Sequence, residues 1–495
     1  MASAAAQTAD VLSPEIVGNP DDPPRFLKRS DYGNPPGSGA GSTGFVSTNR
    51  PPKGQNTSQG TWGAPSRPLA PASAGRVASV SAQPRQLPQP ISYPQPLPSA
   101  DPAVTGTIAP KRKPAPEIDP YEPLGVRAGS LLLFPAIELS GGFDSNPHRA
   151  TNPDASSLFI AAPELKVRSD WARHEFRADL RGNYTGYGSA SSLNNPNFRS
   201  TLDGRIDWSR QTRIELQNRF LLSTDTPGSP NFQADVEKPT IYTTFGGSAG
   251  LVHRFNRLEL AGKFNADRTS YRDSKLTDGT TASNEDRNFD EYGFELRGSY
   301  ELTPGVRPFV AVEADRRVHD LAIDSSGIQR DSNGFSPRIG TSFELTRQLT
   351  GDVSVGYLKR NYKDPSLPEL RGAIADASLA WSATRLTTVT LTANSAAYES
   401  IDADVSGILA RDFGIQLDHA FRDWLIGTLE LGFGLDDYVG SNREDRRFSA
   451  AAELTYKLNR EMQIKGEARR EQRSSNESGQ DYTANIFLLG LRLQR

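Results

Sequence analysis

Strict alternation of apolar and polar residues is the feature that most constrains this chain. In the segment HEFRADLRGNYTGY, residues 174–187, every second residue from Phe176 to Tyr184 is apolar, aromatic or small, and most residues between them are charged. Because successive side chains of a strand point to opposite faces, this pattern predicts a β-strand with one apolar and one polar face. Eighteen such segments follow Gly125: 127–142, 157–169, 174–187, 198–209, 212–224, 240–254, 256–271, 290–302, 306–318, 334–346, 350–362, 373–383, 387–398, 407–419, 424–437, 446–458, 461–471 and 482–493.

The connections between these segments alternate between long and short along the whole region. Short ones such as Arg210-Gln211 and Thr303-Pro304-Gly305 suit tight hairpins, and long ones such as 272–289 are rich in Asn, Asp, Ser and Gly. Outer-membrane barrels have short turns at one end, long loops at the other and an even number of strands. The sequence therefore predicts an all-β fold in which residues 125–495 form an 18-stranded antiparallel transmembrane β-barrel.

Aromatic residues favour a membrane barrel over a soluble β-sandwich, a propeller or a solenoid. A sandwich or propeller has no reason to alternate its loop lengths, and no fixed solenoid repeat is visible in the sequence. On the predicted outer face, aromatic residues form two belts, as expected at two membrane interfaces. The belt near the short turns is Trp208, Tyr300, Phe343, Trp381 and Tyr456, and the belt near the long loops is Phe159, Tyr184, Phe220, Phe245, Tyr292, Phe335, Phe433 and Phe448.

The first 124 residues differ in composition from the rest and hold 23 of the 36 prolines. Such a segment has too little apolar surface to offset its ordering entropy. We predict that residues 1–124 form a disordered Pro/Gly/Ser-rich tail in the periplasm. Ala-Ser-Ala and Ala-Ala-Ala among the first residues resemble the cleavage end of a signal peptide whose other regions are incomplete or missing in this chain.

Composition also limits the chemistry of the chain. No window approaches 18 consecutive apolar residues, which excludes membrane-spanning helices. The net charge of −3 gives no argument for nucleic acid as a partner, and the absence of cysteine removes thiolate metal sites and cysteine catalysis. The five histidines, at 148, 174, 253, 319 and 419, fit no metal motif. We expect no cofactor and no bound metal.

The best candidate for catalysis is His319-Asp320, where a histidine oriented by an aspartate could activate water. The pair stands at the predicted outer rim of the ninth strand, and the sequence fixes no second carboxylate pair nearby. A histidine in a solvated rim loop is the simpler interpretation. We therefore predict that the protein is not an enzyme.

The polar positions of the strands predict the inner wall of the barrel, which at 18 strands is wide enough for an aqueous channel. The residues predicted to line this pore carry both signs: Arg177, Asp179, Arg181, Asp203, Arg205, Arg213, Glu215, Arg219, Glu259, Lys263, Glu295, Arg297, Glu313, Arg338, Glu344, Glu430, Glu453, Lys465 and Glu467. Since neighbouring opposite charges cancel beyond a Debye length of ~8 Å, ion selectivity should be weak. The external loop 272–289, with its four acids, would supply an acidic constriction if it folded inward: Asp273, Asp278, Glu285 and Asp286.

One part of the sequence resembles a known family. The strand PLGVRAGSLLLFPAIE, residues 123–138, and its exit GGFDSN, residues 141–146, look like the opening strand of the putative β-barrel porin 2 family. The resemblance covers about residues 125–495. It implies an outer-membrane barrel of a Gram-negative bacterium, in contact with outer-membrane lipid and often linked to polysaccharide synthesis and export. It brings no catalytic residues with it.

We therefore predict a wide, polar, weakly selective outer-membrane channel that exports, or associates with, an exopolysaccharide. Polysaccharide or periplasmic export components would be its partners, and these rest on the resemblance alone. The alternative is a non-conducting outer-membrane scaffold whose Pro-rich tail binds periplasmic partners or the cell wall. The sequence leaves the permeant and the oligomeric state open.

Overall fold

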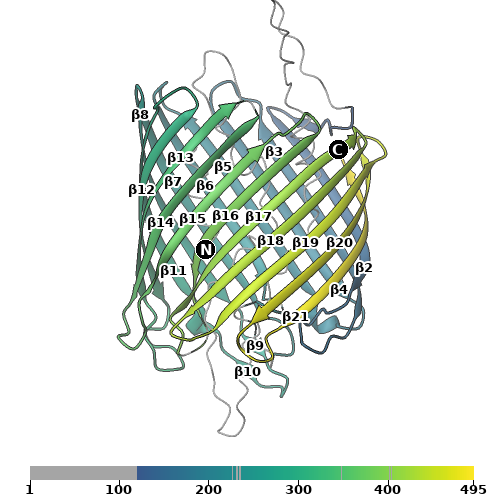
Figure 1. Cartoon of the computed structure of the whole chain (residues 1–495), viewed down its shortest axis with the longest axis vertical. Helices are drawn as coiled ribbons and strands as arrows, with labels where there is room; N and C mark the ends of the chain where they lie inside the picture. Colours follow the sequence, from purple (N-terminus) through teal and green to yellow (C-terminus); the bar gives the residue numbers. More distant parts are fainter. Residues whose placement is uncertain are drawn as a thin grey trace, which may run out of the picture.

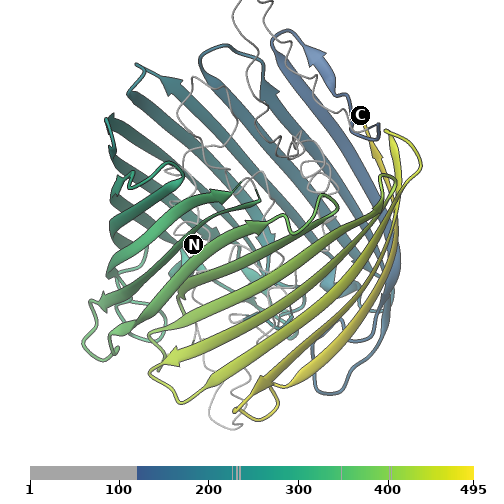
Figure 2. The same ribbon diagram turned by 45° about the horizontal axis from the view of Figure 1, so that its top comes forward.

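The computed structural model describes residues 120–495 except 226, 230–231, 233–235, 347, 401 and 403. Nearly all of the predicted disordered tail, residues 1–119, therefore lies outside the described residues. The described part is one closed, strongly tilted antiparallel barrel (Figures 1 and 2).

Each strand of the barrel pairs with its neighbours in chain order, and β2 with β21 and β8 with β11 complete the ring. The predicted 18-stranded antiparallel barrel is confirmed. Its strands are β2 (Leu131–Asp144), β3 (Ser156–Ser169), β4 (Glu175–Tyr187), β5 (Asn195–Asp207), β6 (Thr212–Thr224), β7 (Ile241–Phe255), β8 (Leu258–Tyr271), β11 (Phe289–Tyr300), β12 (Val306–His319), β13 (Ser332–Thr346), β14 (Leu349–Tyr362), β15 (Leu370–Trp381), β16 (Thr387–Tyr398), β17 (Gly407–Arg422), β18 (Leu425–Val439), β19 (Glu444–Lys457), β20 (Met462–Ser475) and β21 (Tyr482–Gln494).

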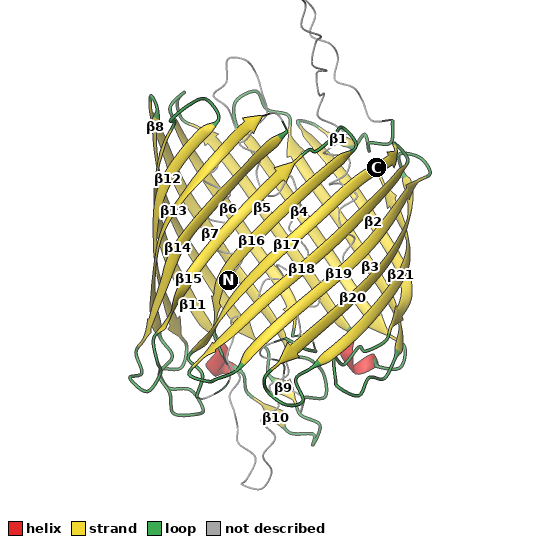
Figure 3. Ribbon diagram, viewed as in Figure 1, coloured by secondary structure: helices red, strands yellow, loops and turns green. Residues whose placement is uncertain are grey.

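Short elements that the periodicity does not reveal complete the described chain. The predicted first strand is divided at Gly129, which has a φ of 63°, into β1 (Val126–Ala128) and β2. The long connection 272–289 contains the hairpin β9 (Ser274–Lys275) and β10 (Thr281–Ala282) and the 3-10 turn η3 (Glu285–Arg287), and η2 (Ser191–Leu193) precedes β5 (Figure 3). Within the described ranges, none of the helical segments has the length and apolar character needed to cross a membrane.

The two ends of the barrel differ as the connection lengths predict. We call the end with short connections the turn side and the end with long connections the loop side; β9 and β10 project beyond the loop side in Figure 1. At the turn side, Thr303-Pro304-Gly305 makes the tight turn between β11 and β12. Gly305 has a φ of 86°, a left-handed conformation that glycine adopts without strain.

The outer face of the wall is apolar and exposed. On β11, Leu296 is 54% exposed, whereas the adjacent Glu295 on the inner face is 4% exposed. The predicted belt residues are exposed on the outer face, except the half-buried Phe220 and Phe343. Such a surface suits lipid and would promote aggregation in water.

The inner face is not uniformly polar, which departs from the predicted pattern. Leu158, Ile160 and Ala162 of β3 pack with Ile486 of β21. These side chains lie on the same parity as the charged wall residues but bury one another across β2, which stands between β3 and β21, so apolar patches interrupt the polar wall.

Candidate functional site

The inner wall is built from ion pairs within single strands. On β4, the Arg181 guanidinium lies 2.7 Å from the carboxylate of Asp179, and on β6 Arg213 lies 2.7 Å from Glu215. Residues two apart on a strand point to the same face, so the alternating acids and bases of the sequence become neighbours. The same arrangement is found in the pairs Arg177–Glu175 of β4 and Arg469–Glu467 of β20.

Other ion pairs join different strands. Arg205 of β5 lies 3.1 Å from Glu175 of β4, and Lys465 of β20 lies 3.5 Å from Glu453 of β19. Arg338 lies 3.4 Å from Glu313 across β12 and β13. The wall is therefore a network in which each of these charges has an opposite charge beside it.

Three ion pairs bridge two strands across a glycine of the strand between them. Arg219 of β6, Gly246 of β7 and Asp267 of β8 are in register, and Arg219 lies 2.7 Å from Asp267. A Cβ added at Gly246 would lie 1.9 Å from an Asp267 carboxylate oxygen, so a larger residue would obstruct the bridge. The same in-register arrangement recurs in the triplets Asp315–Gly334–Arg360 and Asp412–Gly434–Arg447.

The residues predicted to line the pore are all on inner-face positions of the wall, and most are in these networks. Arg297 also pairs with Asp352 at 2.8 Å, and Asp203 accepts a hydrogen bond from Gln217. Lys263 is fully buried opposite Glu295, and Glu430 is buried opposite Gln416. Of the residues predicted to line the pore, these form ion pairs: Arg177, Asp179, Arg181, Arg205, Arg213, Glu215, Arg219, Glu259, Arg297, Glu313, Arg338, Glu453, Lys465 and Glu467. Glu344 is half-buried near the turn side.

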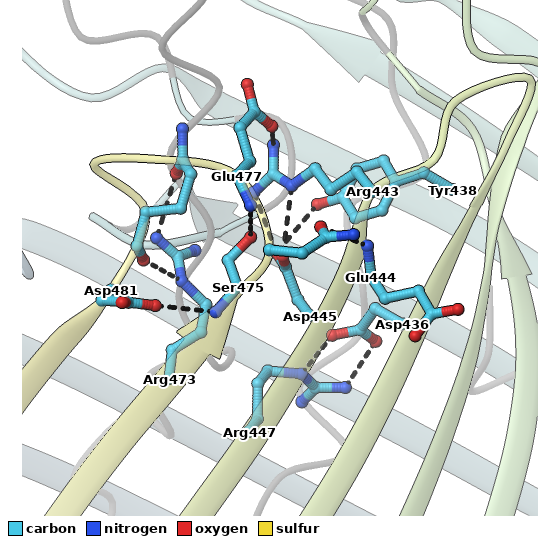
Figure 4. Close-up of polar contacts among 12 residues, drawn as sticks. Asp436, Tyr438, Arg443, Glu444, Asp445, Arg447, Arg473, Ser475, Glu477 and Asp481 are labelled. Atoms are coloured by element: carbon cyan, nitrogen blue, oxygen red, sulfur yellow. Dashed lines mark hydrogen bonds and ion pairs between the residues drawn. The ribbon is translucent and has the colours of Figure 1, made fainter.

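A second network at the loop side was not predicted from the sequence (Figure 4). Arg443, in the loop between β18 and β19, lies 2.8 Å from Asp445 and 3.1 Å from Glu477, and its guanidinium lies over the Tyr438 ring at 4.4 Å. Burial raises the pKa of Glu477 although Arg443 is close. Arg447 lies 2.8 Å from an oxygen of the buried Asp436.

Similar contacts hold other loops against the wall. Arg149 lies 2.8 Å from Asp144 and 3.0 Å from Glu471, which fixes the loop after β2 to β20. Arg287 of η3 lies over Tyr271 at 3.8 Å and pairs with Asp225 at 3.1 Å. In the sequence, this network corresponds to an inward-facing aromatic or acidic residue at the end of a strand. Such a residue cannot be assigned to the network until the arginine that contacts it from a loop is known.

His319 is not in a solvated loop. It is the last residue of β12, it is buried, and its ring lies 5.4 Å from that of Phe289. Its Nδ1 atom lies 3.5 Å from Asp331, whereas the sequence neighbour Asp320 pairs with Arg268. The aspartate beside this histidine is therefore a different one from that predicted, because loop 320–331 folds back onto the strand end.

Asp331 is expected to hold loop 320–331 at neutral pH. Its carboxylate accepts a hydrogen bond from the His319 backbone N–H at 2.8 Å and lies 2.7 Å from Lys363 Nζ. Burial by itself would raise the pKa of Asp331, but these contacts hold that pKa well below its usual value. Its stabilisation is thus fully present above the unfolded pKa of about 3.9, declines gradually below it, and is lost completely only when the pH falls through the lower pKa of the folded state.

We therefore expect Asp331→Asn to increase amide hydrogen exchange in 320–331 at pH 7, and acidification to pH 3 to leave the wild-type loop largely protected. Wild-type protection that is already lost at pH 5 would contradict the assignment.

One hairpin enters the barrel interior. The loop-side ends of β16 and β17 lie inside the wall, where Glu399 pairs with Arg317 of β12. Of the loop 272–289, considered above as an acidic constriction, the hairpin β9–β10 instead projects past the loop-side rim (Figure 1), while the buried Arg287 of η3 pairs with Asp225. Within the described residues, no group of His, Asp and Glu side chains is arranged to hold a metal ion.

Residues 119–495 match the family described as putative beta-barrel porin 2. Similar crystal structures include Pseudomonas aeruginosa OpdK with vanillate (12% identity, TM-score 0.39, 73% of this chain and 99% of that chain). A BenF-like porin from Pseudomonas fluorescens Pf-5 (12%, 0.39, 74% and 99%) and Acinetobacter baumannii OccAB4 (11%, 0.38, 73% and 98%) are also similar. No curated protein sequence matches.

Proposed function

The chain belongs to the putative beta-barrel porin 2 family, and from this premise we propose that it forms a water-filled, weakly selective channel. Family membership supports an outer-membrane location in a Gram-negative bacterium, with the apolar outer face in contact with lipid. The family and the fold are those of a channel, and we propose no catalytic role for the contact between His319 and Asp331.

The observation that carries the proposal is the paired, mixed-sign inner face of a closed 18-stranded barrel. A barrel of this size leaves room for water. Because the charges of pairs such as Arg181 and Asp179 cancel over a few ångströms, the wall has little net field with which to select ions.

We propose further that the permeant is an exported polysaccharide. The family resemblance supports this, and so does a wall dense in hydrogen-bonding groups and without a block of one charge. A hydroxylated chain can exchange hydrogen bonds with water for hydrogen bonds with such groups at small net cost.

We also propose that residues 1–124 lie in the periplasm, with the turn side facing it. The described chain begins on the turn side, where the Pro120 carbonyl accepts a hydrogen bond from Arg460, in the short turn between β19 and β20. Short turns of outer-membrane barrels face the periplasm. Protease added outside intact cells should therefore leave the tail uncut, and cleavage there would contradict this orientation.

Planar-bilayer recordings of the purified full chain test the channel. We expect stable current and a cation-to-anion permeability ratio on the order of one in a KCl gradient. A ratio on the order of ten or more would show that a charged constriction governs the pore, and absence of current would favour the non-conducting scaffold.

Matched wall variants sharpen this test. The double variant Arg177→Gln with Arg181→Gln leaves two acids of β4 without their bases on the same strand, so it should shift the permeability ratio towards cations. The double variant Glu175→Gln with Asp179→Asn leaves the two bases without their acids on the same strand and should shift the ratio towards anions. Shifts of equal size and opposite sign fit a neutral paired wall. Reduction of the current by neutral oligosaccharides, with no reduction by glycerol, would support the polysaccharide.

A further inference from the structure

The wall of the barrel is incompletely paired at one place. β15 pairs twelve residues with β14, and β16 pairs twelve with β17, but β15 and β16 pair only five, from Ala377–Ala393 to Trp381–Val389. This is the shortest pairing among the eighteen of the barrel. The loop-side half of β15 therefore has no ladder partner on its β16 side within the described residues.

The loop-side part of the neighbouring hairpin lies on the inner side of β15, although β17 stays paired with β18 as far as Gly407–Val439. Leu409 stands on the outward parity of β17, yet it is 2% exposed, whereas Phe413 on the same parity is 43% exposed. Leu409 packs against Leu370 and Ile374, which are on the inner face of β15. The outer face of the hairpin thus covers the inner face of β15.

Side chains of the hairpin occupy the free edge of β15. The Ala375 N–H donates to the Ser395 hydroxyl at 2.9 Å, and that hydroxyl donates to the Ala375 carbonyl at 3.0 Å. The Ala373 carbonyl accepts a hydrogen bond from Arg411 at 3.2 Å. An unsatisfied sheet edge is not tolerated in a membrane, and here these side chains replace the missing strand.

The far end of the hairpin is fixed to the inner side of a nearby part of the wall. Glu399 is fully buried and pairs with Arg317 of β12, three strands beyond the adjacent β15. Arg330 donates to the carbonyls of Ser400 and Val405 at 3.2 Å each. These contacts hold the hairpin against the inner wall at β12 and against the loop after it.

The sequence contains a second set of partners for the same residues. Continuing the register beyond Ala377–Ala393 places Ala373 opposite Ala397 and Arg371 opposite Glu399. Arg371 is exposed on the outer face. Moving to the in-wall position, Glu399 would therefore lose Arg317 as its partner and gain Arg371, which has the same charge. Leu409 and Ala397 would then face lipid, as their parity requires.

We infer that residues 394–400 and 404–411 form a hinged gate, which turns at Ala377–Ala393 together with the end of β18 that is paired with it (435–439). It moves between an inward position held by Arg317 and an in-wall position that extends the β15–β16 ladder to Arg371. The inward position narrows the interior at the loop side, and the in-wall position widens it. The effect on current rests on the proposed channel function, but the hinge itself does not.

Cysteine pairs test the hinge directly, because the chain has no cysteine of its own. Gly372→Cys with Leu409→Cys should lock the inward position, since a Cβ at 372 lies 3.9 Å from Cγ of Leu409. Ala373→Cys with Ala397→Cys should lock the in-wall position, where the two residues are directly opposite. Thiol labelling of the unfolded protein after oxidation in membranes counts the disulfides formed.

We expect both pairs to form disulfides, with low conductance for the inward lock and high conductance for the in-wall lock, each reversed by a reductant. A 373/397 disulfide that never forms while 372/409 forms fully would overturn the gate. So would conductance that neither lock alters. If no variant conducts, the channel proposal fails, and formation of the 373/397 disulfide still decides whether the hinge exists.

Charge variants provide a second measurement. Glu399→Gln should raise the occupancy of the high-conductance level about tenfold, the factor expected for loss of one hydrogen bond to a charged group. The matched control Glu471→Gln removes another buried carboxylate, which is paired with Arg149, and should leave this occupancy unchanged.

The contact between Arg371 and residue 399 tests the in-wall register. Arg371→Glu should lower the high-conductance occupancy in the wild-type background and raise it in the Glu399→Lys background, because residues 371 and 399 are opposite only in the in-wall position. Effects of the same sign in both backgrounds would contradict that register. Heat-dependent mobility in SDS gels verifies that each variant folds.

Discussion

Replacing Leu296 with arginine is expected to destabilise the membrane-embedded barrel by about 2–4 kcal/mol. Leu296 is near the middle of β11, on the exposed outer face, with Glu295 and Arg297 turned to the inner face beside it. A charge at this depth loses its hydration without gaining a partner. Equilibrium denaturant titration of the barrel folded in phospholipid vesicles measures the loss in the free energy of unfolding.

The matched control is Leu302→Arg, at the turn-side end of the same hairpin. Leu302 is also exposed on the outside, but it lies beyond β11 near the interface. Here the cost should be about 0–1 kcal/mol. Equal costs at the two positions would mean that the middle of β11 is not in the hydrocarbon layer.

Replacing Arg447 with leucine is expected to cost about 3–5 kcal/mol in unfolding free energy, because it leaves buried charge without a partner. Arg447 lies 2.8 Å from an oxygen of Asp436 and 2.8 Å from Asp412, and Asp436 is almost completely buried. Gly434 of the intervening strand leaves the space through which Arg447 reaches Asp412. The same vesicle titration measures the effect.

The control for this variant is Arg127→Leu. Arg127 pairs with Asp170 at 2.9 Å, but both side chains are exposed, so the expected cost is about 0–1 kcal/mol. Restoration of stability by Asp436→Asn in the Arg447→Leu background would support the unpaired carboxylate as the cause. A cost that persists unchanged would instead indicate lost packing of the arginine side chain.

Much of the fold could be predicted from the sequence because a strand's two faces are a local property. The alternation in residues such as 290–302 is sufficient to separate Tyr292 and Leu296, which are exposed, from Glu295 and Arg297, which are buried. The lengths of connections are equally local, and they distinguish the turn side from the loop side. Neither requires knowledge of which strands meet.

The pairing of the wall charges required partial knowledge of register. Same-strand pairs such as Arg213 with Glu215 follow from spacing alone. The bridge from Arg219 to Asp267 cannot be predicted from spacing. It requires Gly246 of β7 to pair with Arg219 in one ladder and with Asp267 in the next. A shift of one residue in either ladder would turn these side chains to opposite faces.

By itself, the sequence determined a closed barrel with an apolar outer face and a mixed-charge inner face, because side-chain direction repeats every two residues. Only the tertiary structure decided that His319 meets Asp331 and that the hairpin bearing Glu399 leaves the wall to reach Arg317. Both outcomes depend on loops folding back over the barrel. The partners stand 12 and 82 positions apart, and no local periodicity relates them.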